Sequence, residues 1–164
     1  MTAGAIDISE VGNASEWHEF FARADRKFMT QTWAFGEAKR ATGWLPQRLV
    51  LSSGNEVLAI CQVLQRFFGG VLVASRINLG PMMLKGTDNR SAEVHRALRR
   101  RWSFLRRGVL LVAPALEHTV HSQNLLSRAG FSCAVLTDGA RPCWTSPKGS
   151  NGCVVRWSPS GVIN

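Results

Sequence analysis

The segment 57–68 is hydrophobic on both of the faces that a β-strand would present, and this limits the possible folds more than any other feature of the sequence. Successive side chains of a strand point to opposite sides of a sheet. Here both sets are apolar, Val57, Ala59, Cys61 and Val63 on one side and Leu58, Ile60 and Leu64 on the other. We therefore expect a central strand that is buried on both sides, in a mixed sheet flanked by helices, which is an α/β (α+β) fold.

The segments around this strand alternate between strand and helix patterns. Further strands are expected at residues 44–51, 71–79, 109–113 and 131–136, and helices at 15–26, 31–43, 88–107 and 124–129. The chain of 164 residues has the size of one domain, which we assign to residues 1–145. Residues 146–164 are expected to be an irregular tail, because they are rich in Pro, Gly and Ser and show no pattern of a long element.

The charge, the cysteines and the lack of long apolar segments indicate which kind of partner and which cellular compartment to expect. Lys and Arg outnumber Asp and Glu by 20 to 11, a formal net charge of +9, which favours phosphate-bearing partners. The cysteines are Cys61, Cys133, Cys143 and Cys153. They form no Cys-x-x-Cys pair and have no histidine at zinc-ligand spacing, so we expect reduced thiols and no metal site. The sequence has no signal region and no apolar run of the roughly 18 residues that a transmembrane helix needs, so we predict the cytoplasm.

The segment 31–44, a predicted helix and the residue after it, combines two tryptophans, Trp33 and Trp44, with a lysine and a glycine inside the helix. Gly36 costs this helix about 1 kcal/mol relative to alanine, so we interpret it as allowing another backbone or a ligand to approach closely. Lys39 follows three residues later, with Phe35 one turn before it, so its ammonium group would project from an aromatic ledge. The alternative is that both tryptophans belong to the core and that Lys39 is an ordinary solvated lysine.

Seven arginines make the predicted helix 88–107 strongly basic. Arg96, Arg100 and Arg107 fall on one outward face, and such a face could bind RNA phosphates or an anionic membrane surface. A solvated helix surface explains the same pattern. No zinc finger, helix-turn-helix or RNP-type motif in the sequence supports specific recognition of nucleic acid.

The sequence motifs for catalysis are weak. Histidine titrates near neutrality, but we interpret His118 and His121, beside Glu117, as part of a solvent-facing loop before the helix 124–129. The sequence has no Gly-x-Ser-x-Gly elbow, no Walker-type loop and no dinucleotide-binding glycine motif. No catalytic residue and no general base is assigned.

Five short motifs occur in a fixed order between residues 15 and 145. They are Gln31-Thr-Trp-Ala-Phe-Gly-Glu-Ala-Lys39, Gly43-Trp44, Gln62-Val-Leu, Leu79-Gly80-Pro81 and Leu125-Leu-Ser-Arg-Ala-Gly-Phe131. This series resembles the first half of the FemAB family, the peptidoglycan-bridge aminoacyltransferases and their acyltransferase relatives, whose lobes have the GNAT acetyltransferase fold. The first motif contributes most to the resemblance.

The resemblance implies transfer of an acyl or aminoacyl group to the amine of a phosphate-bearing cell-envelope precursor, which is an intermediate of peptidoglycan or polysaccharide. In that family the lysine that matches Lys39 is associated with the diphosphate of the precursor, and Gly80-Pro81 corresponds to a turn in the substrate cleft. The predicted substrate-binding residues are Lys39, Trp33, Gly36, Trp44, Gly80 and Pro81. The sequence lacks the loop that binds the pyrophosphate of coenzyme A in GNAT enzymes. This favours aminoacyl-tRNA or another acyl donor, and we predict no cofactor.

The sequence departs from the family in length. Family members have a second GNAT-like lobe, whereas the likeness here fades after Thr145 and the chain ends at Asn164. The resemblance therefore implies an incomplete active centre, to be completed by a second lobe or by another copy of the chain, and a truncated or frame-shifted reading frame would explain the tail. Two other interpretations stay open. One is a non-catalytic polyanion-binding module that uses the basic helix, and the other is an inert fragment of a decayed gene.

Overall fold

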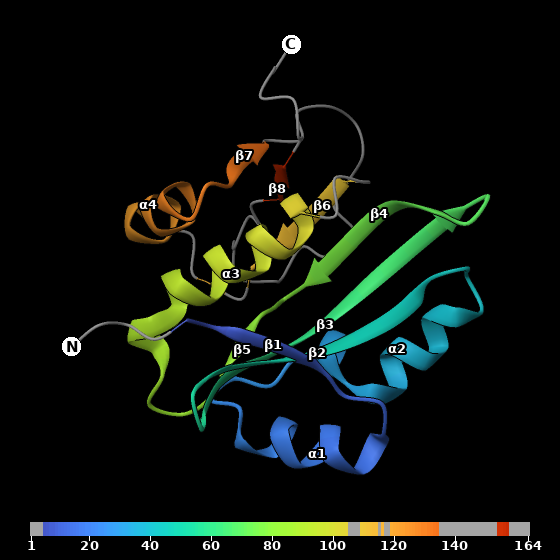
Figure 1. Cartoon of the computed structure of the whole chain (residues 1–164), viewed down its shortest axis with the longest axis horizontal. Coiled ribbons are helices and arrows are strands. Elements are labelled where there is room, and N and C mark those ends of the chain that lie inside the picture. The colour runs from blue at the N-terminus through green and yellow to red at the C-terminus, as the bar shows by residue number, and fades with distance from the viewer. Residues whose placement is uncertain (1–4, 105–108, 115, 117–118, 135–153, 158–164) are drawn as a thin grey trace.

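The computed structural model describes residues 5–104, 109–114, 116, 119–134 and 154–157 (Figure 1). The strands are β1 (Asp7–Glu10), β2 (Leu45–Ser53), β3 (Glu56–Phe68), β4 (Val71–Asn78), β5 (Met82–Met83), β6 (Val109–Ala113), β7 (Ser132–Ala134) and β8 (Val154–Trp157). The helices are α1 (Ala14–Arg23), α2 (Trp33–Arg40), α3 (Ser91–Phe104) and α4 (Val120–Arg128), with short 3-10 helices η1 (Met29–Gln31) and η2 (Asp88–Arg90). None of the helices in these ranges is long and apolar enough to cross a membrane.

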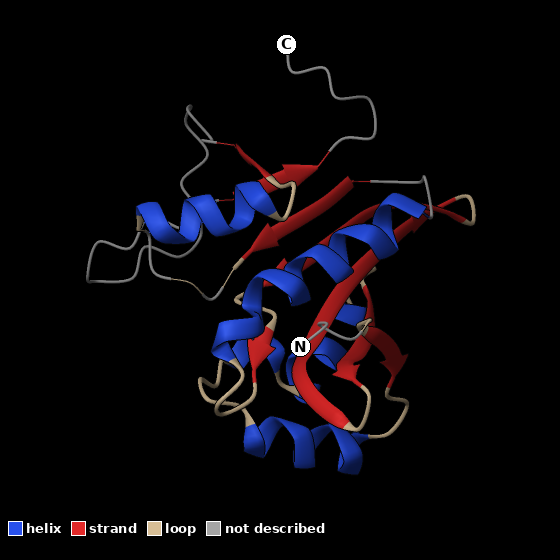
Figure 2. Ribbon diagram, turned by 60° about the vertical axis from the view of Figure 1, so that its left-hand side comes forward, coloured by secondary structure: helices blue, strands red, loops and turns tan. Residues whose placement is uncertain are grey.

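The strands form one mixed sheet with helices on both of its faces (Figure 2). The strand order is β1–β2–β3–β4–β6–β8–β7, and β5 pairs with β3 beside this path. β4 and β6 run parallel and are connected through α3, whereas the other described pairs are antiparallel. The predicted class, a mixed central sheet flanked by helices, is confirmed.

Two hydrophobic clusters cover the two faces of β3. On one face, Leu98 and Trp102 of α3 are buried in the same cluster as Cys61. On the other face, Trp17 of α1 is buried in a cluster with Ile60. The prediction of a central strand buried on both sides is therefore confirmed, and Cys61 is the small core residue that its apolar surroundings predicted.

The predicted alternation of side chains is wrong at the start of β3. Leu58 belongs to the α3 cluster and Val57 packs against the α1 cluster, which is the reverse of the prediction. The register between β2 and β3 shifts here, because Leu51 pairs with Ala59 and Ser52 with Val57. Leu58 is thus an extra residue in β3, and a bulge of this kind exchanges the two faces.

Two helices begin at different residues than predicted because of their caps. Asn13, rather than Ser15, caps α1, and its side-chain oxygen accepts a hydrogen bond of 2.8 Å from the Glu16 backbone N–H. The predicted helix 31–43 is shorter. It begins after Thr32, whose hydroxyl accepts a bond from the Phe35 N–H, and ends at Arg40.

Two predictions near the C-terminus differ more strongly from the structure. α4 begins four residues before the predicted start at residue 124, because Thr119 caps it by accepting a bond of 3.2 Å from the Ser122 N–H. His121 therefore lies in a helix rather than in a loop, and His118 lies outside the described residues. Within the predicted irregular tail 146–164, residues 154–157 form β8 between β6 and β7.

The side chain of Gln31 joins β3 and β4 at the point where they separate. β3 pairs with β4 as far as Val63 and Ile77, and beyond this point it pairs with β5 instead. Gln31 is fully buried there. Its Nε2 donates to the carbonyl of Asn78 at 2.7 Å and to that of Gln62 at 3.3 Å, and its Oε1 accepts from the Gln62 N–H at 2.6 Å. The carboxamide therefore satisfies backbone groups that lose their strand partner.

We expect Gln31→Ala to lower the free energy of unfolding by about 2 to 4 kcal/mol, because it leaves buried backbone groups without partners. The matched control is Gln47→Ala on β2, whose half-buried side chain bonds to the exposed Glu10, and which should cost about 1 kcal/mol or less. Urea unfolding followed by circular dichroism measures both. Similar small losses in the two variants would contradict the role of Gln31.

Candidate functional site

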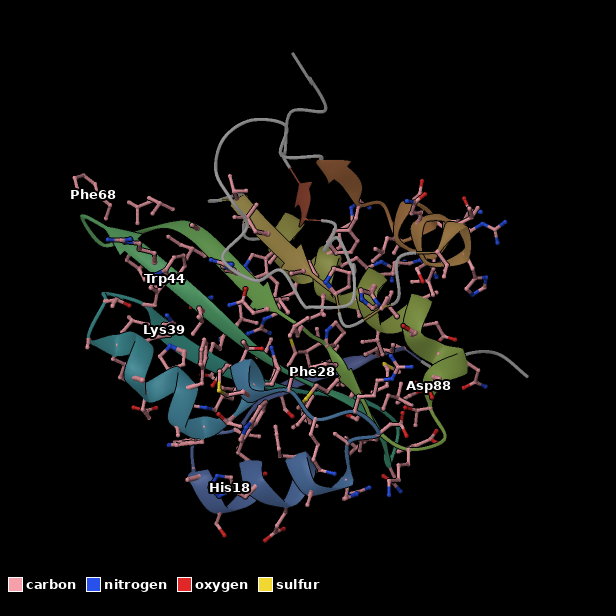
Figure 3. The ribbon with its side chains drawn as sticks, turned by 180° about the vertical axis from the view of Figure 1, so that it is seen from behind. His18, Phe28, Lys39, Trp44, Phe68 and Asp88 are labelled. Carbon is pink, nitrogen blue, oxygen red and sulfur yellow. The ribbon has the colours of Figure 1, made fainter. Side chains whose placement is uncertain are left out.

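The ammonium group of Lys39 lies over the ring of Phe35, with Nζ 5.2 Å from the ring centroid. Lys39 is half-buried in the last turn of α2, where a positive charge is favourable because of the helix dipole. The backbone N–H of Trp44 donates to the Lys39 carbonyl at 3.2 Å, and the Trp44 ring faces the guanidinium of Arg66 at 5.8 Å. Lys39 and Trp44 lie along one side of the molecule (Figure 3). This is the aromatic ledge that the spacing predicted, and its role in substrate binding stays a prediction.

The face of Trp33 is occupied by a buried arginine that the sequence analysis did not single out. The guanidinium carbon of Arg48, on β2, lies 3.5 Å from the centroid of the Trp33 ring, and Arg48 is 3% exposed. Its Nη2 donates to the Trp33 carbonyl at 3.1 Å and to Glu37 Oε1 at 2.9 Å. The hydrogen bond from Arg48 lowers the pKa of the Glu37 carboxyl, and burial lowers the pKa of Arg48. Trp33 therefore helps to fix α2 on the sheet.

Gly36 lies against the side chains of Gln62 and Arg48. A Cβ at this position would be 2.3 Å from Gln62 Oε1 and 2.7 Å from Arg48 Nη2. Gln62 is itself 1% exposed, and its Nε2 donates to the carbonyls of Thr30 and Thr32. The close approach that Gly36 was predicted to allow is thus made by two side chains of the sheet, and a role of Gly36 in substrate binding stays a prediction.

Gly80 and Pro81 have different surroundings. A Cβ on Gly80 would be 2.8 Å from Nε2 of Gln31, so this glycine allows the buried carboxamide to approach the turn after β4. Leu79, just before it, has a φ of 48°, and the Gly80-Pro81 peptide bond is cis. Pro81 lines a pocket. Gly80 is not among the residues that line this pocket, and a role of either residue in substrate binding stays a prediction.

The pocket lies at the carboxyl ends of the parallel strands β4 and β6, and its volume is about 370 Å³. Pro81 and Asp88 line it from the segment after β4, Ser91 and His95 from the start of α3, and Thr119 and His121 from the start of α4. Asp88 and Phe28, another lining residue, are labelled in Figure 3. In open α/β sheets this edge of a parallel pair is where ligands bind. Lys39 lines neither this pocket nor a second hollow of about 630 Å³ beside the end of α1.

His95 is the buried titratable group of this pocket, with an exposed fraction of 2%. Its Nδ1 lies 2.8 Å from the Ser91 carbonyl oxygen, so Nδ1 carries the proton of the neutral ring and Nε2 carries the lone pair. Nε2 is buried without a hydrogen-bond partner in the described part of the chain. Burial lowers the pKa of His95, and the bond to Ser91 opposes this effect. The sequence analysis considered His118 and His121, interpreted them as part of a solvent-facing loop, and gave His95 no role.

The basic helix α3 has the outward face that its sequence predicted. Arg96 and Arg100 are exposed, while Val94, Leu98 and Trp102 are buried on the opposite side. Arg107 lies outside the described residues. Polyanion binding by this helix stays a prediction.

No protein-family model matches the chain, and no curated protein sequence matches it. Solved structures do. FemX has a TM-score of 0.62 and 15% identity, covering 83% of this chain and 34% of the FemX chain. A GNAT-family protein from Desulfovibrio desulfuricans has a TM-score of 0.57 and 11% identity, covering 95% of this chain and 100% of the other. A GNAT-family acetyltransferase from Elizabethkingia anophelis with acetyl-CoA bound has a TM-score of 0.50 and 10% identity, covering 92% and 94%.

These similarities show a GNAT-like fold, as the resemblance implied. The identities are too low to show a shared activity. The chain spans about a third of the length of the FemX chain that it matches.

We expect Gly36→Ala to lower the free energy of unfolding by about 1 to 3 kcal/mol, because the new methyl group would collide with Gln62 and Arg48. The sign of the change in the free energy of unfolding is informative, because helix propensity alone would make the alanine variant more stable by about 1 kcal/mol. Gly12→Ala is the control, because a Cβ there meets nothing within 4 Å. Equal stability of the two variants in urea unfolding would contradict the packing of Gly36.

We also expect His95 to make stability depend on pH. Burial lowers the pKa of His95 in the folded state below the ordinary 6.5 of the unfolded chain. The unfolded chain therefore binds the proton more tightly than the folded chain does. As the pH falls below about 6.5, the free energy of unfolding decreases. His95→Gln should remove a loss of up to about 1.4 kcal/mol per pH unit. The control His121→Gln changes an exposed histidine. Urea midpoints at about pH 7.5 and about pH 5.5 measure the effect, and the same pH dependence in both variants would rule it out.

Proposed function

We propose that the chain is a lobe of an acyl- or aminoacyltransferase that acts on the amine of a phosphate-bearing cell-envelope precursor. The observation that supports this most is the pocket at the carboxyl ends of β4 and β6, within a GNAT-like fold. FemX, a name that agrees with the FemAB resemblance of the motifs, has a higher TM-score than the two GNAT proteins compared with it. The donor and the remaining part of the site would come from a second lobe or another copy of the chain.

Lys39 is the residue proposed to meet the diphosphate of the precursor. Its ammonium group is positioned by Phe35 and by the turn to Trp44, so less side-chain entropy is lost when it binds than for a free lysine. The surroundings of α2 are positive, since the nearby acid Glu37 is already paired with Arg48 and Arg40. A charge-assisted contact to phosphate fits this setting.

The pocket offers the chemistry that amine acylation needs. A neutral amine attacks the carbonyl carbon of an activated ester, the ester oxygen leaves, and the amine loses a proton. His95 is the proposed acceptor of that proton, because a pKa lowered by burial leaves its ring neutral at pH 7. Its Nε2 is fully buried, so the pocket must open toward this atom when the substrate binds. Apolar residues of the same pocket, including Phe28 and Leu125, would exclude water from the ester.

The start of α3 fits the diphosphate of coenzyme A poorly. The backbone N–H groups of Thr87 and Arg90 are bonded within the chain, to the carbonyls of Leu84 and Thr87, and the N–H of Ser91 is bonded to Asp88. Asp88 also places a carboxylate in the first turn of η2, the 3-10 helix just before α3. Phosphate sites at helix starts need available N–H groups and no opposing negative charge. This supports aminoacyl-tRNA or another acyl donor over coenzyme A.

We expect Lys39→Ala to weaken the binding of a UDP-linked muropeptide by on the order of tenfold, because a charged hydrogen bond contributes about 1.5 to 3 kcal/mol. Isothermal titration calorimetry with the whole chain measures this affinity. The matched control is Lys27→Ala, an exposed lysine that donates only a long bond of 3.4 Å to the Ala24 carbonyl. Equal affinities of the wild type and the Lys39 variant would count against the proposed role.

A second candidate, a polyanion-binding module, is favoured by the exposure of Arg96 and Arg100 on α3. The same titration separates the two functions. If the double variant Arg96→Gln, Arg100→Gln loses affinity for arbitrary RNA as well as for the muropeptide, while Lys39→Ala loses neither, the module is the better account.

A further inference from the structure

Exposed hydrophobic side chains gather at the turn between β3 and β4. Phe68 is 82% exposed, and Phe67, Val71 and Val73 are 43%, 45% and 41% exposed. The turn itself is Gly69-Gly70, and the hairpin reaches beyond the helices that cover the rest of the sheet (Figure 1). We call these four residues the hairpin tip. The largest exposed hydrophobic patch of a protein is often functional, so the tip is a candidate interaction site.

Phe68 and Val71 of the hairpin tip share one face of the sheet with basic residues, while Phe67 lies on the opposite face of β3. Arg66 and Phe68 alternate on the same side of β3, and Arg76 of β4 lies directly opposite Leu64, also on that side. The Arg66 guanidinium faces the ring of Trp44, which places this side next to α2 and Lys39. Arg66 and Arg76 are both exposed.

Acidic residues are missing from the same region of the sequence. Residues 38–55 and 57–87 contain no Asp and no Glu, while they contain Lys39, Arg66 and Arg76. These two stretches therefore carry only positive side-chain charges, and Glu37, the acid just before the first of them in the sequence, is paired with Arg40 and Arg48. This basic side is complementary to a layer of anionic phosphates, and it includes Trp44, a residue type that is enriched at membrane interfaces.

We propose that the hairpin tip is a membrane anchor that inserts into the headgroup region of a bilayer containing anionic lipids, with Arg66 and Arg76 contacting lipid phosphates. The tip by itself exposes on the order of 300 Å², taking about 200 Å² for a whole phenylalanine side chain. A specific protein interface needs about 800 Å² per partner, so a lipid surface fits the tip better than a second protein does.

The hydrophobic side chains of the tip and the basic side chains beside it are both required for strong binding. An apolar element of this size gives only marginal and reversible binding to lipid, as a single acyl chain does. Each basic residue close to an anionic surface adds about fivefold to the partition coefficient. Binding should therefore be strong only when the hydrophobic and the anionic parts of the target are both present.

The test is sedimentation of the whole chain with vesicles of phosphatidylcholine, with or without about 30% phosphatidylglycerol. We expect binding to the anionic vesicles, at least tenfold weaker binding to the neutral ones, and a further loss in high salt. The double variant Phe67→Ser, Phe68→Ser should lose at least tenfold in binding to anionic vesicles. Val120→Ser, which changes a side chain that is 74% exposed on α4, is the control and should bind as the wild type does.

Arg66→Gln and Arg76→Gln separate the charge from the apolar contact. Each should weaken binding to anionic vesicles about fivefold and leave binding to neutral vesicles unchanged. A Phe68→Trp variant reports insertion directly, because lipids brominated in their acyl chains should quench its added fluorescence, whereas they should quench Val120→Trp much less.

Three results would overturn the proposal. One is a wild-type chain that does not sediment with anionic vesicles. Another is a double variant that binds as well as the wild type. The third is a wild-type dimer in analytical ultracentrifugation that the double substitution converts to a monomer, with no insertion of Phe68→Trp, since the tip would then contact a second copy of the chain.

Discussion

The arrangement of the site depends on one buried carboxamide. β3 and β4 must separate for the chain to leave the sheet after Asn78, turn at Leu79 and enter the segment that lines the pocket. Separation leaves backbone groups of both strands without partners in a buried place, which is costly. Gln31 supplies the missing donor and acceptor, and the Trp17 indole N–H donates to the Gln31 carbonyl at 3.1 Å. Helix α1, the 3-10 helix η1 and the point where β3 and β4 separate are thus joined by one network of hydrogen bonds.

The parts of the fold that depend on local pattern could be predicted from the sequence, and those that depend on partners far along the chain could not. The buried strand, the basic helix and the position of Lys39 over Phe35 follow from periods of two and of about four residues. The reversal at Leu58 follows from its register with β2, which no pattern within the strand contains. β8 is short and lies in a stretch rich in Gly and Ser, and its pairing with β6 and β7 is what makes it a strand.

The candidate site shows the same division. Trp33 and Gly36 of α2 were noticed because their types are unusual in a helix. Their contacts proved to be Arg48 and Gln62, two polar residues of β2 and β3 that look ordinary in the sequence. His95 was missed because a lone histidine in a basic helix resembles a surface residue. Its position in the helix was a usable signal, since it is next to Val94 and three residues before Leu98 on the apolar side.

The proposed ledge and pocket are compatible with one elongated substrate. The strand pairings show how far the ledge lies from the end of β4. Leu45, the residue after Trp44, pairs with Gln65, and Gln65 pairs with Ser75, so the ledge is level with Ser75. From Ser75 to the end of β4 at Asn78 is roughly 10 Å at about 3.3 Å per residue. A precursor whose phosphate lies at Lys39 and whose reactive amine reaches the pocket therefore needs a spacer of at least this length. A stem of a few residues spans it, since an extended chain covers about 3.3 to 3.6 Å per residue. A free amino acid does not, so the geometry favours an amine at the end of a peptide over a small amine as acceptor.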